Sequence, residues 1–479
     1  MSKSKPPRSP TEADRRQEPR PDGTRDRPTL EVSRRDFLTF ATSFAVLGQV
    51  AGCHSGGEVV VEPGVGLTGE GNIVLPELLW YGNTSAELHT PDDWQVEVRE
   101  MHGAKRPGMT PEQMAAAIND PIGTRPIREL AKGKKKAVIL FDDMTRPTRV
   151  DQIAPLVVEE LLAGGIAEDA ISFVCALGTH GALTQNELRK KVGVEILERF
   201  RVYNHNCYEH CVEVGTTSRG TRLLINREVM SADLKIGIGC VTAHANTGFS
   251  GGGKIVLPGV AHMGSIAHYH IAVPATDRQS TGLGRYDHNV MRFDIEEAAR
   301  MAGLDFKVDV VVNERGVATA MYAGDFLQCH QQAVVAAKEI YALDRTGAKA
   351  DLVVVNAFAK PNEMLIAYML GIQTLYPHKG GTIVLVANAP EGQVVHYLLG
   401  RFGEDYGGLR YPTAVVFDEW KLVVQAPHFD KTFGDWFANP DAITWTRDWE
   451  GTLEVVRPLH GAGSKVVVIP NATMTYYPG

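Results

Sequence analysis

Short apolar runs alternate with segments of helical spacing along most of the chain. Runs that are apolar at nearly every position are typical of strands buried on both faces, as in parallel sheets covered by helices. The pattern therefore predicts an α/β fold with a mostly parallel sheet. The predicted strands in this part are 136–141, 170–176, 234–239 and 306–312, and the predicted helices are 150–163, 185–200 and 325–343.

A second set of apolar runs predicts a second α/β domain that begins near residue 345. Its predicted strands are 351–356, 382–387, 414–417 and 465–469. Their spacing suits βαβ units. We therefore predict one α/β domain over residues 75–344 and another over residues 345–479. Near the start, the segments 79–81 and 94–98 flank turn residues and predict a hairpin.

The first 53 residues have the features of an export signal. Residues 1–30 are rich in Pro, Arg and Asp, which predicts disorder. Arg34 and Arg35 precede an apolar run at 37–51 that is about half the length of a membrane-spanning helix. This arrangement resembles a twin-arginine signal.

The end of the apolar run, Val50-Ala51-Gly52-Cys53, resembles a bacterial lipobox. Lipidation of Cys53 after cleavage would anchor the protein on the periplasmic or cell-surface side of the membrane, with residues 54–74 as a tether. The alternative is an ordinary signal peptide with a chance cysteine. We favour the lipid anchor and predict that residues 1–53 are a signal peptide for the twin-arginine translocase.

The composition is that of an ordinary globular protein, with 44% hydrophobic and 22% charged residues. The formal net charge of −8 gives no indication of nucleic-acid binding. Six cysteines in 479 residues are too few for a disulfide scaffold.

The segment His244-Ala-Asn-Thr-Gly-Phe-Ser-Gly-Gly-Gly-Lys254 carries the densest candidate chemistry. Glycines let the backbone approach a ligand and turn N–H groups toward an anion. Lys254 could pair with a phosphate or act as a nucleophile. Most of a P-loop is present, but Ile255 replaces the Ser/Thr that holds Mg²⁺. Pro258 would break the P-loop helix, so an NTPase is disfavoured.

Further candidate residues follow predicted strands, where ligands bind in open α/β sheets. Asp143 and Arg146 follow the strand 136–141, and Arg146 could bind a carboxylate or phosphate or simply pair with an aspartate. His180 follows the strand 170–176, and it is either an acid/base group or a loop histidine bonded to backbone.

Two histidine-rich segments are candidates for metal binding. The segment His205-Asn-Cys-Tyr-Glu-His-Cys211 matches no usual zinc spacing, and a structural role is favoured. His262, His268 and His270 follow Lys254 closely, and their nitrogen donors suit Ni, Cu or Zn.

Together these segments closely resemble the nickel-pincer lactate racemase family. The segments are Asp142-Asp143-Met-Thr-Arg146-Pro-Thr, Gly178-Thr-His180, Gly215-Thr-Thr-Ser-Arg219-Gly and His244 to Lys254 followed by Pro-Gly, in the family's order. The resemblance implies two α/β domains, the first of them catalytic and cofactor-binding, with the active site in the cleft between them. The implied reaction is racemisation or epimerisation of a 2-hydroxy acid by reversible hydride transfer from Cα.

The resemblance also implies a cofactor and the residues that hold it. The cofactor is the nickel complex of pyridinium-3-thioamide-5-thiocarboxylic acid mononucleotide, which is joined to a lysine that matches Lys254. His270 is the implied nickel ligand, with His268 as the second choice. The remaining cofactor-binding residues are expected to be Asp143, Gly251, Gly252 and Gly253.

By the same resemblance, His180 and His244 are the two acid/base groups and Arg146 binds the substrate. One departure concerns the family's Gln and Lys that help to hold the substrate, because Ile366 and Met369 occupy those positions in our alignment. A small carboxylate would be poorly held by apolar side chains, so a 2-hydroxy acid other than lactate is expected. The alternative is a relative that binds a hydroxy acid or a related ligand without turnover.

Cofactor installation by cytoplasmic enzymes requires a protein that folds before export, and twin-arginine systems carry folded proteins. Changing Arg34 and Arg35 to Lys should therefore leave cofactor-loaded protein in the cytoplasm, as measured by cell fractionation and intact mass. Unimpaired export of the double variant would contradict the signal assignment.

Overall fold

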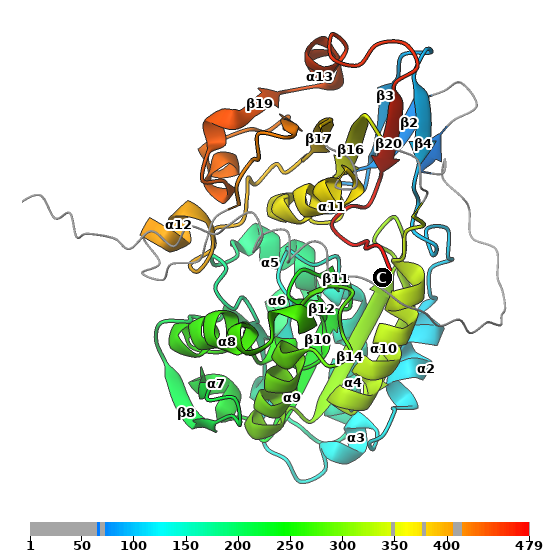
Figure 1. The fold of residues 1–479 in the computed structure, drawn as a ribbon. Helices are drawn as coiled ribbons and strands as arrows, with labels where there is room; N and C mark the ends of the chain where they lie inside the picture. The colour runs from blue at the N-terminus through cyan, green and yellow to red at the C-terminus, as the bar shows by residue number, and fades with distance from the viewer. Residues whose placement is uncertain (1–64, 68–71, 346–349, 376–379, 406–413, 479) are drawn as a thin grey trace, which may run out of the picture.

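The computed structural model describes residues 65–67, 72–345, 350–375, 380–405 and 414–478. Its two largest sheets each have six strands, and they occupy the lower and upper parts of Figure 1. The expected signal peptide and Cys53 lie outside the described residues. Within the described residues, no helix is both long and apolar enough to cross a membrane.

The first sheet has the strand order β15-β14-β10-β5-β6-β7. Neighbouring strands are parallel except for β14 and β15, which are antiparallel. The strands are β5 (Ala137–Phe141), β6 (Ile171–Cys175), β7 (Arg201–Asn204), β10 (Leu234–Cys240), β14 (Phe306–Val312) and β15 (Ala318–Gly324).

Alternate residues of the central strand β5 enter two separate apolar clusters. Ile139 and Phe141 pack in a cluster with helix α4 (Val150–Ala163). Val138 and Leu140 pack in another with helices α8 (Met263–Thr276) and α9 (Val290–Ala302). Because successive side chains of a strand point to opposite faces, helices cover this sheet on both sides.

The second sheet has the strand order β19-β18-β17-β16-β20-β4, and all of its neighbouring strands are parallel. Helix α11 (Leu365–Leu375) packs against β16 and β17. The predicted fold class, two α/β units with mostly parallel sheets, is confirmed. The strands are β4 (Gln95–Val98), β16 (Leu352–Asn356), β17 (Thr382–Val386), β18 (Lys421–Gln425), β19 (Ile443–Thr446) and β20 (Lys465–Ile469).

The predicted hairpin near the start is wrong. Strand β2 (Asn72–Pro76) pairs with β3 (Ser85–His89) instead, and β4 joins the edge of the second sheet beside β20. The range 75–344 thus includes one strand of the second sheet. Strands β1 (Gly66–Leu67) and β2 also begin inside the range 54–74 that we expected to be a tether.

Two other elements differ from the prediction. No strand forms over 414–417, where Ala414 makes only an isolated bridge, and β18 takes that place in the sheet. The helix predicted over 185–200 is divided into α5 (Gln185–Val192) and α6 (Val194–Arg199). Gly193 separates them with a φ of 84°, which a glycine adopts without a steric cost.

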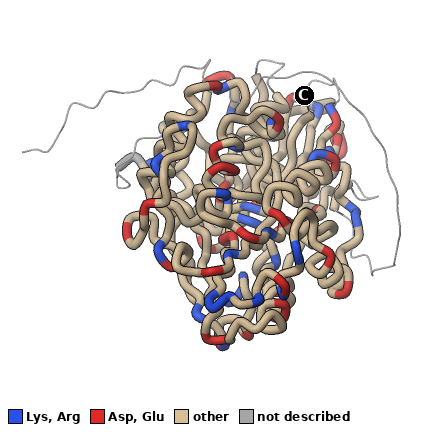
Figure 2. Tube along the Cα trace, turned by 90° about the horizontal axis from the view of Figure 1, so that it is seen from below, with Lys and Arg blue, Asp and Glu red and all other residues tan. Residues whose placement is uncertain are grey.

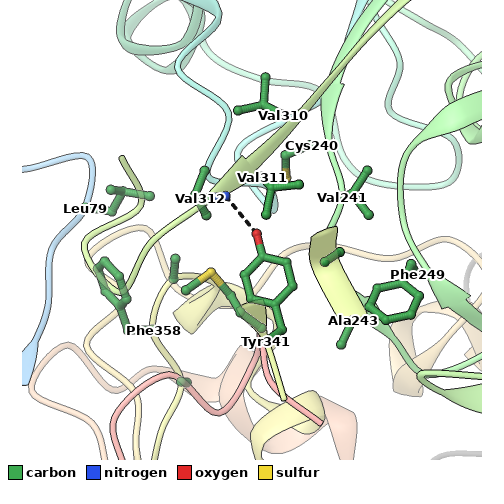
Figure 3. Close-up of a cluster of buried hydrophobic side chains, with 14 of the residues drawn as sticks. Leu79, Cys240, Val241, Ala243, Phe249, Val310, Val311, Val312, Tyr341 and Phe358 are labelled. Atoms are coloured by element: carbon green, nitrogen blue, oxygen red, sulfur yellow. Dashed lines mark hydrogen bonds between the residues drawn. The ribbon is translucent and has the colours of Figure 1, made fainter. Parts of the chain in front are cut away.

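The two sheets share one apolar core. Figure 3 shows Tyr341 packed among residues of β14, Phe249 of the glycine-rich segment 244–254, and Phe358, which follows β16. The buried hydroxyl of Tyr341 accepts a hydrogen bond from the N–H of Val312 (2.9 Å). Lys and Arg are interspersed with Asp and Glu along the chain (Figure 2). The shared core holds the loops of both sheets in contact, so residues far apart in sequence can line one cavity.

Candidate functional site

A cavity of about 140 Å³ lies where loops from both sheets meet. Most of its lining residues come from segments that follow the carboxyl ends of β5, β6, β10, β16 and β17. This is the edge at which open α/β sheets bind ligands. The ionisable side chains of greatest interest in the lining are Asp143, Arg146, His180, His244, Lys254, His270, Glu363 and His396.

Lys254 is a half-buried lysine whose amine contacts His244. Its Nζ lies 2.7 Å from His244 Nε2. The Nδ1 of His244 accepts hydrogen bonds from the N–H groups of Asn246 (3.2 Å) and Thr247 (3.4 Å), so the proton of the neutral ring lies on Nε2. That proton is donated to the lone pair of an uncharged Lys254.

Burial lowers the pKa values of both Lys254 and His244. Burial, followed by the charges of Arg146 and Arg292, holds the pKa of Lys254 well below its ordinary value. Burial and the neighbouring Lys254 likewise hold the pKa of His244 well below its ordinary value. A lysine amine is nucleophilic only when it is uncharged, and the environment of Lys254 favours that form.

The glycines before Lys254 are held by a buried carboxylate. The N–H of Gly252 donates to Asp309 Oδ2 (2.9 Å), and Asp309 also pairs with Lys307 Nζ (2.6 Å) and His330 Nδ1 (2.8 Å). Gly252 has a φ of 58°, and a Cβ there would lie 2.6 Å from the Cγ of His330. Only glycine therefore fits at this position.

The three predicted cofactor-contacting glycines do not all face the cavity. Gly251 lines it, whereas Gly252 and Gly253 are absent from the lining. A Cβ on Gly253 would lie 2.8 Å from the Cβ of Ala299 on α9, so its role is close packing. The segment forms only the short 3₁₀ turn Gly252–Ile255, not the helix that follows a P-loop.

His180 is oriented by Asp143. His180 Nδ1 donates to Asp143 Oδ2 (2.5 Å), which leaves Nε2 as an acceptor 4.0 Å from Glu363 Oε1. The other oxygen of Asp143 accepts from the N–H (2.9 Å) and hydroxyl (2.5 Å) of Thr145. Both oxygens of Asp143 are thus engaged, and in the structure this carboxylate orients His180.

The partnership shifts the pKa values of both groups. Burial alone would lower the pKa of His180, but the charge and hydrogen bond of Asp143 outweigh burial and raise it. Burial alone would raise the pKa of Asp143, but His180 outweighs it and the pKa is lowered. The environment of His180 therefore favours its protonated form.

Arg146 is joined across the domains to Glu363. Its Nη1 donates to Glu363 Oε2 (2.8 Å) and to the carbonyl of Thr145 (2.8 Å). Within the described residues, every side-chain hydrogen bond of Arg146 runs from Nη1, so Nη2 remains available to an incoming carboxylate. Arg146 outweighs the effect of burial and lowers the pKa of Glu363, which stays ionised.

Neither Lys360 nor Glu363 was predicted as a site residue from the sequence. Lys360 Nζ donates to the hydroxyl of Thr242 (3.0 Å), and burial, followed by the charge of Arg146, lowers the pKa of Lys360 to about 7. Lys360 and Glu363 follow β16 as Asp143 and Arg146 follow β5. Position after a strand was therefore the signal that could have identified them.

Ile366 and Met369 do not line the cavity. Both lie on α11, which begins at Leu365, whereas the residue of this region that reaches the cavity is Glu363, in the turn before the helix. The substrate contacts expected of Ile366 and Met369 stay a prediction, and in the structure a charged group from the preceding turn, Glu363, lies in the cavity lining.

His270 faces the cavity and His268 does not. His270 Nδ1 donates to the carbonyl of Ile266 (2.9 Å), so Nε2 keeps a free lone pair. Burial lowers its pKa to about 4, which keeps the ring neutral. His268 Nδ1 is instead hydrogen-bonded to the hydroxyl of Thr221 (2.9 Å).

Both nitrogens of His205 are engaged by structural hydrogen bonds. Nε2 donates to the carbonyl of Ala261 (2.9 Å), and Nδ1 contacts the side-chain amide of Asn226 (3.1 Å). Throughout the part of the chain that the structure describes, no group of three His, Cys, Asp or Glu side chains could hold a metal ion.

The sequence and fold resemble known racemases. Residues 81–282 match the family model of the lactate racemase N-terminal domain. A lactate racemase from Thermoanaerobacterium thermosaccharolyticum is 28% identical over 328 residues, which cover 67% of this chain and 75% of the relative. A lactate racemase from Lactiplantibacillus plantarum is 30% identical over 287 residues, which cover 59% of this chain and 66% of the relative.

Two solved structures share the fold. The lactate racemase apoprotein from T. thermosaccharolyticum superimposes with a TM-score of 0.65 at 22% identity, over 85% of this chain and 100% of that one. A structural-genomics protein from Thermotoga maritima gives a TM-score of 0.57 at 18% identity, over 78% of this chain and 99% of that one. With residues 81–282 matching a lactate racemase N-terminal domain, the chain is a homologue of lactate racemases and an isomerase of the racemase type.

Proposed function

We propose that the protein racemises or epimerises a 2-hydroxy acid with a nickel-pincer nucleotide cofactor joined to Lys254. The observation that carries the proposal is a lysine amine whose pKa is held well below its ordinary value, in the same cavity as His180, Arg146 and His270. When bound, the cofactor supplies reversible hydride transfer at Cα of the substrate. The active site would be this cavity, between the two domains.

The residues present fit such a cofactor. The neutral amine of Lys254 can form the thioamide link, because only an unprotonated amine has a lone pair to share. His270 presents the tautomer of a metal ligand, with Nδ1–H on a carbonyl and Nε2 free. One protein ligand suffices where the cofactor supplies the other donors, and His270 would be that ligand.

The chain's own residues would bind the substrate and move its proton. Nη2 of Arg146 is available to the substrate carboxylate, with Nη1 held by Glu363. His180 Nε2 would take the proton of the C2 hydroxyl, and Asp143 would stabilise the resulting imidazolium. His244 would act as the second acid/base group on the opposite face of C2.

We further propose that the mature protein is exported by the twin-arginine translocase and held by lipidated Cys53. The cytoplasmic cofactor-synthesis enzymes would be its partners before export. The Arg34 and Arg35 double variant described above tests this proposal.

The proposed substrate is a 2-hydroxy acid other than lactate. Glu363 already engages Arg146, so a small carboxylate must share the guanidinium with it and gains few other contacts. We expect kcat/KM for lactate to lie about 10²-fold or more below that for a longer 2-hydroxy acid, from the cost of an imperfectly paired charge. A panel of 2-hydroxy acids assayed by chiral chromatography measures this. Equal kcat/KM for lactate and the best longer acid would contradict it.

Protein made together with the cofactor-synthesis enzymes should carry a mass increment on Lys254 and one nickel ion. Lys254→Arg should show neither, because it lacks the nucleophilic amine. His270→Ala should keep the increment and lose nickel. Intact-mass and metal analysis of the same preparations measure this. An unmodified Lys254 from such cells would rule out the covalent cofactor.

The reaction should depend on the protonation of His180. In the direction in which His180 is the base, kcat/KM should fall as the pH drops through a pKa above 6.5, because the protonated ring cannot accept a proton. Asp143→Asn removes the charge that raises this pKa. The variant should move the acidic limb to lower pH and lower kcat by about 10²-fold or more. A limb that stays in place would show that Asp143 does not control His180.

A further inference from the structure

His396 is a histidine of the second domain that lines the cavity. It follows β17 and is 8% exposed. The N–H of Tyr397 donates to the carbonyl of Thr179, and the N–H of Gly181 donates to the carbonyl of Val395, both at 2.8 Å. These backbone hydrogen bonds fix the loop of His396 beside the loop of His180. The centroids of the two imidazole rings lie 4.9 Å apart, in an edge-to-face contact.

Two backbone hydrogen bonds decide where His396 carries its proton. Nδ1 accepts from the N–H groups of Leu398 (3.1 Å) and Leu399 (2.9 Å). A ring nitrogen that accepts two N–H groups carries no proton, so the proton lies on Nε2 and the ring is neutral. Burial, followed by the charges of His180 and His270, holds the pKa of His396 well below its ordinary value, which agrees with this assignment.

The neighbouring rings of His180 and His396 therefore have opposite roles in hydrogen bonding. His180 donates from Nδ1 to Asp143 and keeps Nε2 as an acceptor. His396 accepts at Nδ1 and carries its one donor at Nε2, where the hydroxyl oxygen of Thr179 lies 3.5 Å away. Oxidation of a hydroxyl to a carbonyl is helped by two groups: one that accepts the hydroxyl proton, and one that donates a hydrogen bond to the same oxygen.

We propose that His396 is a catalytic residue that donates a hydrogen bond from Nε2 to the C2 oxygen of the substrate. The inference rests on the proposed function. The bound cofactor would supply the hydride transfer at Cα, and as the hydroxyl proton passes to His180 the C2 oxygen would become a carbonyl oxygen. His396 stabilises it without gaining or losing a proton, and the return steps reverse these transfers.

Three substitutions separate the donor at Nε2 from the acceptor at Nδ1. The amide of Gln reaches about as far as Nε2 and can replace the donor, the amide of Asn reaches about as far as Nδ1, and Phe supplies neither. We expect His396→Gln to stay within about tenfold of wild type in kcat. His396→Asn and His396→Phe should lose about 10²-fold in kcat with KM nearly unchanged. The mass increment on Lys254 and the nickel content should match wild type in all three.

His460→Phe is a matched control from the same domain. His460 is also 8% exposed and hydrogen-bonded, with Nε2 2.8 Å from the hydroxyl of Thr382, but it does not line the cavity. Its kcat should equal that of the wild type. Thermal unfolding of every variant identifies any that fail to fold, and the Gln and Asn pair then decides the outcome without Phe.

Three results would overturn the role of His396. These are a wild-type kcat in His396→Asn, a loss in His396→Gln as large as in His396→Asn, and a loss confined to KM. A variant that loses the Lys254 increment would assign His396 to cofactor loading instead. Wild-type protein without increment and without turnover would overturn the proposed function itself, and that result is distinct from the others.

Discussion

The buried carboxylate of Asp309 holds the glycine-rich segment to the first sheet. It is fully buried, and its partners are Lys307, His330 and the N–H of Gly252. A buried charge that lost its partners would cost several kcal/mol, so these groups stay together or the region unfolds. Lys254 lies two residues beyond Gly252, and its position in the cavity depends on the hydrogen bond from Gly252 to Asp309. Glycine is required at the anchor because His330 occupies the space of a side chain.

Burial then divides the ionisable groups of the cavity into two classes. Groups with a partner of opposite charge remain charged, as Arg146 does with Glu363 and His180 can with Asp143. Groups without such a partner become neutral, as Lys254 does. The same desolvation thus produces a nucleophilic amine and a strong proton acceptor within one small space. This separation is what a covalent cofactor and a proton transfer at neutral pH both need.

Much of the first sheet and several residues of the cavity could be predicted from the sequence. The apolar runs located β5, β6, β10 and β14, and the polar residues after them identified Asp143, Arg146 and His180. The second domain was harder, because its strand β4 comes from the start of the chain and pairs with β20, about 370 residues later. No local pattern records such a pairing. Glu363 and His396 were missed because neither belongs to a motif, although each follows a strand of that sheet.

The sequence by itself determined the alternation of strands and helices, the glycines before Lys254 and the break of the P-loop pattern at Pro258. These features depend on the spacing of side chains and on backbone freedom, which are local. The tertiary structure alone decided the protonation states and tautomers on which the chemistry depends. His180 is raised in pKa by a residue 37 positions away, and Arg146 is paired with one 217 positions away. Proton positions follow from burial and from partners in space, and only the folded chain supplies both.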